Sequence, residues 1–117
     1  TLARDGLTSQ TLRSEQGGLS GRPLFARSTR MLAQVYRLTA GTMPLIGVGG
    51  IDSPESALAK IEAGASLIQM YTGLIFEGPQ LLDRIKRRLV QAVSDASATS
   101  LATLTGRRAE EWAFKTL

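Results

Sequence analysis

The sequence predicts an α/β fold built from consecutive strand–helix units. Two apolar runs, residues 45–51 and 65–71, have the composition of buried strands, and residues 57–63 between them follow a helical pattern. Two strands joined through a helix in this close order form a βαβ unit, whose strands are parallel. We therefore expect a parallel sheet with helices packed against it.

The first third of the chain supplies a loop and one helix. Residues 1–6 read as the middle of a loop, and residues 13–23 form a glycine-rich loop. Ser28 or Thr29 is expected to cap a helix that runs toward Gly41 and packs on the outside of the fold. Its apolar positions are Met31, Leu32, Val35, Tyr36 and Leu38. We expect Met31 and Tyr36 to make core contacts, not ligand contacts.

The first apolar run ends in a glycine turn that suits an anion. Gly47, Gly49 and Gly50 let backbone N–H groups approach a ligand without interference from a Cβ atom. Ser53 is a suitable N-cap and Pro54 a suitable first helical residue, so the positive end of a helix faces the same region. The turn predicts a phosphate site, with an ordinary strand-to-helix turn as the alternative. It is not the G-x-G-x-x-G fingerprint of a dinucleotide site.

The second unit repeats this arrangement. The helix after Pro54 ends at Gly64, the strand over residues 65–71 follows, and Thr72-Gly73 and then Gly78-Pro79 come next. The next helix has its apolar stripe at Leu82, Ile85, Leu89 and Val93. Both parallel strands thus end in glycine-bearing loops on one edge of the sheet. In (β/α)₈ barrels, the loops after the seventh and eighth strands commonly form a phosphate site.

The last segment, residues 94–117, carries no motif that we can place. Ala, Ser and Thr residues over 94–105 indicate a connector, and Gly106-Arg107-Arg108 precedes a short helix with Trp112 and Phe114. These aromatic side chains are expected either to dock the tail onto the rest of the fold or to lie in an exposed end.

Three glycine-bearing motifs occur in order along the chain. They are GGLSGRPL at residues 17–24, PLIGVGGI at 44–51, and GASLIQMYTG at 64–73 with Gly78-Pro79 after it. In this order and spacing they resemble the C-terminal part of a class 2 dihydroorotate dehydrogenase, over roughly residues 1–90. The triplet Tyr71-Thr72-Gly73 resembles this quinone-linked class more than class 1.

The resemblance implies a fold and an activity. It implies the C-terminal part of a (β/α)₈ TIM barrel, whose last βα units hold the phosphate of FMN. The parent enzyme would oxidise dihydroorotate to orotate and pass electrons to a membrane quinone, in de novo pyrimidine (UMP) biosynthesis. Class 2 enzymes reach the quinone through an N-terminal segment that lies outside this sequence. The implied location is therefore peripheral, on the bacterial cytoplasmic membrane or the mitochondrial inner membrane.

The resemblance also implies cofactor-binding residues. Gly21, Gly50, Tyr71 and Thr72 match the family's FMN-contacting positions, with Gly49 as a backbone neighbour. The N–H groups of Gly50, Tyr71 and Thr72 would surround the phosphate, and Gly21 would leave room for the cofactor. The alternatives are a strand-end aromatic packed on a helix for Tyr71 and a simple cap for Thr72.

No catalytic residue is expected in this sequence. The family's catalytic serine and its flavin-contacting lysine belong to a middle segment of the barrel, and its substrate-binding Asn-Thr pair would end just before Thr1. Ser20 and Ser28 have no His, Cys or nearby Asp or Lys pattern to activate them, so they are expected to be loop or capping residues.

Length and composition bound the remaining possibilities. A complete barrel needs about 250 residues, so 117 residues are expected to form only part of one, with residues 1–93 in the barrel and 94–117 as connector and tail. The remaining segments of the barrel are then an expected binding partner of this chain. The chain has no Cys and no His, so no metal site is expected. No apolar run approaches the roughly 20 residues of a membrane span.

The net charge of +4 does not by itself indicate nucleic-acid binding. The densest basic run is expected to form the solvated face of the last clear helix; it consists of Arg84, Lys86, Arg87 and Arg88. It has no interleaved aromatic residues to stack bases, so no nucleic-acid partner is expected. Three interpretations remain open: part of a quinone-dependent dihydroorotate dehydrogenase, part of a class 1 or other phosphate-binding barrel enzyme, or a non-catalytic phosphate-binding module.

Overall fold

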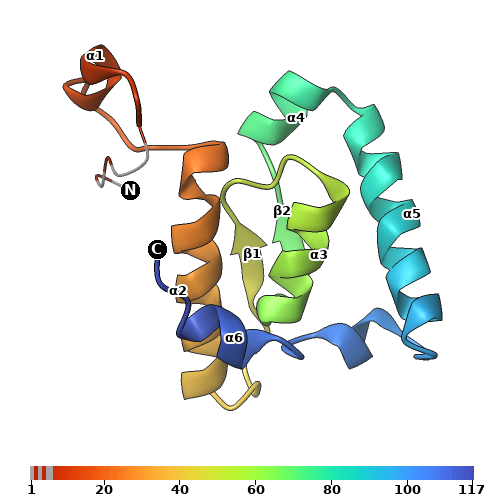
Figure 1. The fold of residues 1–117 in the computed structure, drawn as a ribbon. Helices are drawn as coiled ribbons and strands as arrows, with labels where there is room; N and C mark the ends of the chain where they lie inside the picture. Colours follow the sequence, from red (N-terminus) through yellow and green to blue (C-terminus); the bar gives the residue numbers. More distant parts are fainter. Residues whose placement is uncertain (1, 3, 5–6) are drawn as a thin grey trace.

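A computed structural model describes residues 2, 4 and 7–117. The loop expected over residues 1–6 therefore lies largely outside the described residues. A two-stranded parallel sheet occupies the centre, made of β1 (Ile46–Val48) and β2 (Leu67–Gln69), with Ile46 opposite Leu67. Figure 1 shows the helix between these strands, α3 (Pro54–Ala63), against the sheet, with α2 (Phe25–Leu38) and α5 (Gln80–Asp95) on either side. The expected βαβ unit is confirmed.

The first long helix begins earlier than the sequence pattern suggests, and a short helix precedes it. A short turn of helix, α1 (Gln10–Arg13), precedes the glycine-rich loop, and a 3₁₀ turn, η1 (Arg22–Leu24), leads directly into α2. The expected cap at Ser28 or Thr29 is wrong, because both lie inside α2, where each hydroxyl donates to the carbonyl of Phe25. Pro23 supplies the early start, since its fixed φ suits a first helical turn.

The start and end of α3 follow the sequence rules. The Ser53 hydroxyl accepts from the N–H of Ser56 at 3.1 Å, and the Ser56 hydroxyl accepts from the N–H groups of Asp52 and Ser53. Gly64 ends the helix at φ 123°, a conformation that suits glycine. The N–H groups of Asp52, Ser53 and Ser56 are thus engaged inside the cap.

Beyond β2 the chain forms three further helical elements before the tail helix. They are α4 (Thr72–Glu77), α5, and the 3₁₀ turn η2 (Leu101–Leu104), after which α6 (Ala109–Ala113) follows. Thr72-Gly73, expected in a loop, is the first turn of α4. An added Cβ at Gly73 would lie 2.0 Å from the carbonyl oxygen of Ile51, so glycine lets α4 start against the loop that follows β1.

The core lies between the helices in three adjoining clusters. The first joins α2, α3 and α6 through Ala33, Ala63, Ala109, Trp112 and Ala113. The second joins α3, α5 and η2 through Leu58, Ile61, Ala65, Ala92 and Leu104. The third joins the loop after β1 to α3 and α5 through Ile51, Ala57, Leu81 and Ile85.

These clusters correct two expected core contacts and confirm a third. Leu81 is fully buried on α5 and Leu82 is 41% exposed, whereas Ile85 of the predicted stripe is buried as expected. Met31 is 58% exposed and is not a core residue, whereas Tyr36 packs on the first cluster. The basic residues Arg84, Lys86 and Arg87 are exposed on α5, as expected, and Arg88 is half-buried.

One face of the sheet has no helix over it within the part of the chain that the structure describes. Gly47 faces the helices and is buried, whereas Ile46, Val48 and Leu67 are more than half exposed. We name these three residues the uncovered sheet face. Burial on both faces, expected from the apolar run, is therefore absent among the described residues. In a parallel barrel this face is filled by side chains from other strands.

The tail docks on the fold, which settles the alternative left open for residues 94–117. The Trp112 side chain is 6% exposed and meets the Phe25 ring edge-on at 5.8 Å between centroids. The guanidinium of Arg37 lies 4.6 Å from the centroid of the more exposed Phe114 ring. Glu62 of α3 accepts hydrogen bonds from both Arg107 and Arg108. The tail is thus held by an aromatic contact and by ion pairs.

Candidate phosphate site at the ends of the two strands

A cavity lies where β1 and β2 end, and all four predicted cofactor-binding residues line it. Its volume is about 230 Å³. We name it the glycine cavity; its lining residues are Ser20, Gly21, Leu24, Val48, Gly49, Gly50, Ile51, Met70, Tyr71, Thr72 and Gly73. Gly21, Gly50, Tyr71 and Thr72 are separated by up to 51 positions in the chain, and the fold brings them to one place.

The backbone of the cavity offers donors to a ligand. Within the described residues, no hydrogen bond uses the N–H groups of Gly50, Tyr71 or Thr72. Gly50 has φ 72°, and Gly21 has φ 78°, so both lie in the region that favours glycine. An added Cβ at Gly21 would lie 3.3 Å from the Thr72 methyl group. The two glycines thus keep the walls of the cavity close together and free of side chains.

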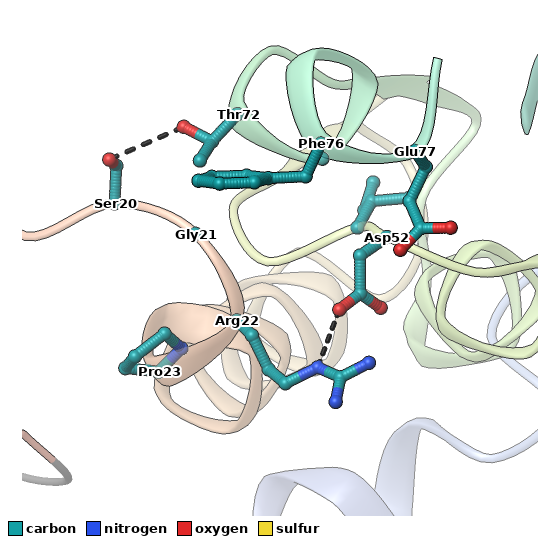
Figure 2. Close-up of a pocket in the computed structure, with 10 residues that line it drawn as sticks. Ser20, Gly21, Arg22, Pro23, Asp52, Thr72, Phe76 and Glu77 are labelled. Atoms are coloured by element: carbon teal, nitrogen blue, oxygen red, sulfur yellow. Dashed lines mark hydrogen bonds and ion pairs between the residues drawn. The ribbon is translucent and has the colours of Figure 1, made fainter. Parts of the chain in front are cut away.

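The Tyr71 and Thr72 side chains point to different surroundings. Tyr71 is 78% exposed, so its ring does not pack into a core within the described residues. The Thr72 hydroxyl donates to the Ser20 hydroxyl at 3.3 Å, which joins the start of α4 to the glycine-rich loop. Figure 2 shows this bond spanning the gap between the two segments. Ser20 is therefore a loop residue, as expected, and it borders the cavity.

A second cavity of about 420 Å³ adjoins the first and shares five lining residues with it: Ser20, Gly21, Ile51, Thr72 and Gly73. We name it the Arg22 cavity. Its wall includes an ion pair, with Arg22 Nε 2.6 Å from Asp52 Oδ2, which sequence reasoning missed because the two residues are 30 positions apart. This hydrogen bond raises the pKa of the Arg22 guanidinium. Phe76 and Glu77 of α4 complete the wall (Figure 2).

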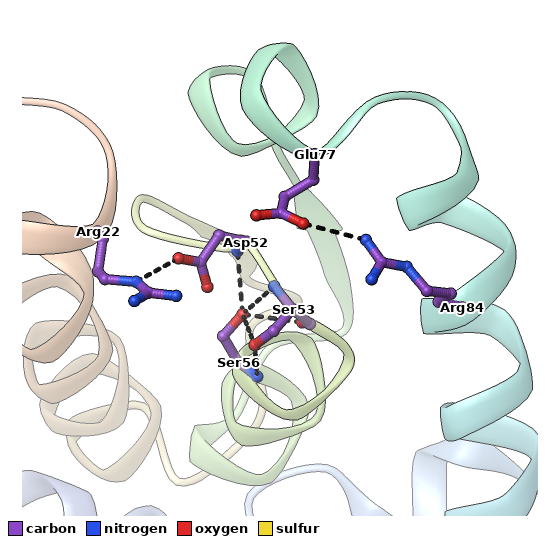
Figure 3. A network of polar contacts seen from close by, with 6 residues as sticks. All are labelled: Arg22, Asp52, Ser53, Ser56, Glu77 and Arg84. Carbon is purple, nitrogen blue, oxygen red and sulfur yellow. Dashed lines mark hydrogen bonds and ion pairs between the residues drawn. The ribbon is translucent and has the colours of Figure 1, made fainter.

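The polar groups around the Arg22 cavity are paired with one another. Figure 3 shows Arg22 with Asp52 on one side and Glu77 with Arg84 on the other, with the Ser53–Ser56 cap between them. Arg84 Nη2 lies 3.2 Å from Glu77 Oε2. Each of these cations has a carboxylate partner, whereas the glycine cavity offers backbone N–H groups without an acceptor among the described residues.

A buried lysine stands behind the glycine cavity, and it was also missed. Lys60 of α3 is 0% exposed and donates to the Ser28 hydroxyl at 2.6 Å. The sequence around Ser28 has no Lys pattern, but the fold brings Lys60 to it from 32 positions away. Burial lowers the pKa of Lys60 to about 8. Nothing in the local sequence signals this burial, because a lysine in the last turn of a helix is usually solvated.

The described part of the chain holds neither a metal-binding cluster nor a membrane-spanning helix. There, no three His, Cys, Asp or Glu side chains lie close enough to hold a metal ion. No described helix is both long and apolar enough to cross a bilayer.

Two parallel strands that end in glycine turns at one edge of the sheet, with helices packed beside them, are typical of part of an α/β barrel. Residues 2–93 match the family model of dihydroorotate dehydrogenase. The chain is 52% identical over 117 residues to proteins named dihydroorotate dehydrogenase (quinone) from Brucella ovis and from Brucella anthropi. It is covered completely in both alignments and spans 32% of the length of each relative.

Comparison with solved structures indicates the same family. A DHODH from Eimeria tenella in complex with ferulenol superposes with a TM-score of 0.81 at 36% identity, over 92% of this chain and 28% of that one. The ligand-free type from the same organism gives 0.79 over 89% of this chain and 28% of that one, again at 36% identity. The chain belongs to the dihydroorotate dehydrogenase family. Its two parallel strands and their helices are part of the family's (β/α)₈ barrel.

Proposed function

We propose that this chain forms the cofactor-phosphate end of a quinone-dependent dihydroorotate dehydrogenase. The observation that carries the proposal is the glycine cavity, in which Gly21, Gly50, Tyr71 and Thr72 meet although the sequence separates them. The name shared by the Brucella relatives supports dihydroorotate as the substrate, orotate as the product and a quinone as the electron acceptor. A longer polypeptide or complex that completes the barrel would carry the whole activity.

The group that we propose for this cavity is FMN. When bound, FMN supplies hydride acceptance from dihydroorotate and transfer of electrons to the quinone. The fit of its phosphate is supported by the unused N–H groups of Gly50, Tyr71 and Thr72 and by the absence of a Cβ at Gly21. Main-chain donors would hold the phosphate, and the Ser20–Thr72 bond would keep the two walls in register.

The division of the chain into a barrel part and a tail is also a proposal. Residues 1–93 would form the barrel part and residues 94–117 the connector and tail, although α5 runs on to Asp95. The tail would stabilise α2 and α3 without touching the cofactor, since its contacts lie on the first and second core clusters. The uncovered sheet face would be covered by the remaining strands of the barrel. A peripheral membrane location would depend on a segment outside this chain.

The test uses a hybrid barrel, in which this chain replaces the matching C-terminal portion of the Brucella ovis relative. We expect the purified hybrid barrel to show the visible absorption band of a bound flavin and to lose it when dihydroorotate is added without oxygen. A quinone should then restore the band. A flavin band whose absorption does not change on addition of dihydroorotate would indicate another flavoenzyme. A hybrid barrel that folds but binds no flavin would reject the proposal.

A further inference from the structure

Lys60 is a fully buried cation directly beneath the end of β1. Its side chain passes Gly47, where an added Cβ would lie 3.2 Å from the Lys60 Cβ and 2.9 Å from the Ala65 Cβ. The glycine in the strand therefore leaves the space that the lysine stem uses. The ammonium lies 5.1 Å from the centroid of the Phe25 ring, on α2.

The ammonium is satisfied by neutral groups of the chain. Nζ donates to the Ser28 hydroxyl at 2.6 Å and to the carbonyl oxygen of Val48 at 3.3 Å. No acidic side chain pairs with it within the described residues. A buried charge without a counter-ion is costly, so its retention needs a reason beyond packing.

Ser28 connects the ammonium to the glycine turn. Its hydroxyl accepts from Lys60 and donates to the carbonyl oxygen of Gly49 at 3.1 Å, with the carbonyl of Phe25 as a second acceptor. The Val48 and Gly49 carbonyls are thus both drawn toward α2 and α3. These two residues and Gly50 line the glycine cavity.

Because the peptide bond is planar, the orientation of the Gly49 carbonyl also fixes the direction of the Gly50 N–H in the cavity. The carbonyl of Gly49 and the N–H of Gly50 belong to one trans peptide unit, so they point in opposite directions. With the Gly49 oxygen held toward the helices, the Gly50 N–H is directed away from them, and it has no acceptor among the described residues. We propose that Lys60, acting through Ser28, is a positioning residue that aims the Gly50 N–H at the cofactor phosphate. This inference rests on the proposed function.

The test compares two flavins that differ in one group. FMN carries the phosphate and riboflavin lacks it, so a positioning defect weakens FMN alone, whereas general damage weakens both. We expect Ser28→Ala and Lys60→Met in the hybrid barrel to raise the dissociation constant of FMN about tenfold to a hundredfold, the worth of one hydrogen bond to a charged group. Riboflavin binding should change less than threefold. Lys86→Met, an exposed lysine on α5, is the matched control and should change neither.

The double variant sharpens the result. Because both residues act on one peptide unit, Lys60→Met with Ser28→Ala should weaken FMN binding by clearly less than the product of the two single effects. A dissociation constant of FMN within twofold of the parent in both single variants would overturn the inference. A parallel loss of FMN and riboflavin would also overturn it.

A second measurement separates this inference from the proposed function. If the parent hybrid barrel binds no flavin, the proposed function fails, and the positioning is judged on the amide signal of Gly50 in glycine-labelled protein. Ser28→Ala should shift the Gly50 signal and leave that of Gly78 in place. An unchanged Gly50 signal would reject the positioning role, whatever the flavin result.

Discussion

Gly50 lies against the first turn of α2 so closely that an added Cβ would be 2.5 Å from the Cβ of Phe25. The glycine therefore has a packing role that does not depend on any ligand. This contact sets the distance between the end of β1 and the start of α2, and so one dimension of the glycine cavity.

Replacing Gly50 by Ala should destabilise the fold. The clash with Phe25 and the positive φ of 72° together predict a loss of about 2 to 4 kcal/mol in the free energy of unfolding. Urea unfolding of the hybrid barrel measures it. Gly17→Ala is the control for backbone strain alone, because Gly17 has φ 116° and no neighbouring atom within 4 Å of an added Cβ. Equal losses in the two variants would contradict the packing role.

Glu62 should be the main polar anchor of the tail. Its carboxylate is buried and accepts hydrogen bonds from Arg107 and from Arg108, the latter at 3.1 Å. Glu62→Gln should cost about 1 to 3 kcal/mol in unfolding free energy, less than for a wholly buried pair because both arginines are partly exposed. Limited proteolysis near residues 106–108 should also become faster. Glu111→Gln, at an exposed partner of Arg108, should change both much less.

The indole of Trp112 should stabilise the fold through its buried apolar surface and not through a hydrogen bond from its N–H group. Among the described residues, Trp112 Nε1 is buried without an acceptor. Trp112→Ala should therefore cost about 3 to 5 kcal/mol in unfolding free energy, and Trp112→Phe clearly less, because Phe keeps much of the contact with Phe25 and removes the unsatisfied donor. Equal losses for Ala and Phe would show that the indole N–H has a partner in solution.

The charge on Lys60 should make stability depend on pH in the alkaline range. Burial lowers the pKa of Lys60 from 10.5 to about 8 in the folded state, so the unfolded chain binds more protons between these values. The cost of burying the charge is fully present below about pH 8, and it is relieved as the pH rises toward 10.5. The difference in unfolding free energy between the parent and Lys60→Met should thus shift in favour of the parent from pH 8 to pH 10. A flat difference would mean that Lys60 keeps its ordinary pKa.

If main-chain donors hold the phosphate, side-chain changes at the cavity should have small effects. Thr72→Val keeps the shape and the N–H but removes the bond to Ser20, so we expect a loss in FMN affinity of less than about tenfold. Tyr71→Phe removes only a hydroxyl from a largely exposed ring, and we expect a change below about twofold. Fluorescence titration of the hybrid barrel with FMN measures both. A loss of a thousandfold in either variant would place the binding energy in side chains.

The features that could be predicted from the sequence are those that depend on local residue preferences. Ser53 and Pro54 begin α3, Gly64 ends it, and the two apolar runs pair as parallel strands. The motifs that carried the resemblance also placed four distant residues that the fold brings to one cavity. Glycine and proline made this possible, because each restricts or permits particular backbone angles whatever lies around it.

What the sequence could not predict depends on how segments approach one another. Lys60 and Ser28 are 32 positions apart, and their contact exists only because α2 and α3 pack on the same face of β1. The local sequence predicts a loop at Gly73, whereas the structure shows that the nearby Ile51 carbonyl is the reason for glycine there. Ile46 and Val48 were expected to be buried, yet the side chains that would cover them belong to no described residue.

The docking of α6 on α2 has a consequence for how the chain folds as it is made. Gln34 donates to the carbonyl of Ala113, 79 positions later, and Trp112 fills the space beside Phe25. The core between α2 and α3 therefore stays open during synthesis until residues 109–113 have left the ribosome. Until then, its alanine-lined groove is accessible to chaperones, so a premature stop codon before Ala109 would leave a product that quality control can recognise.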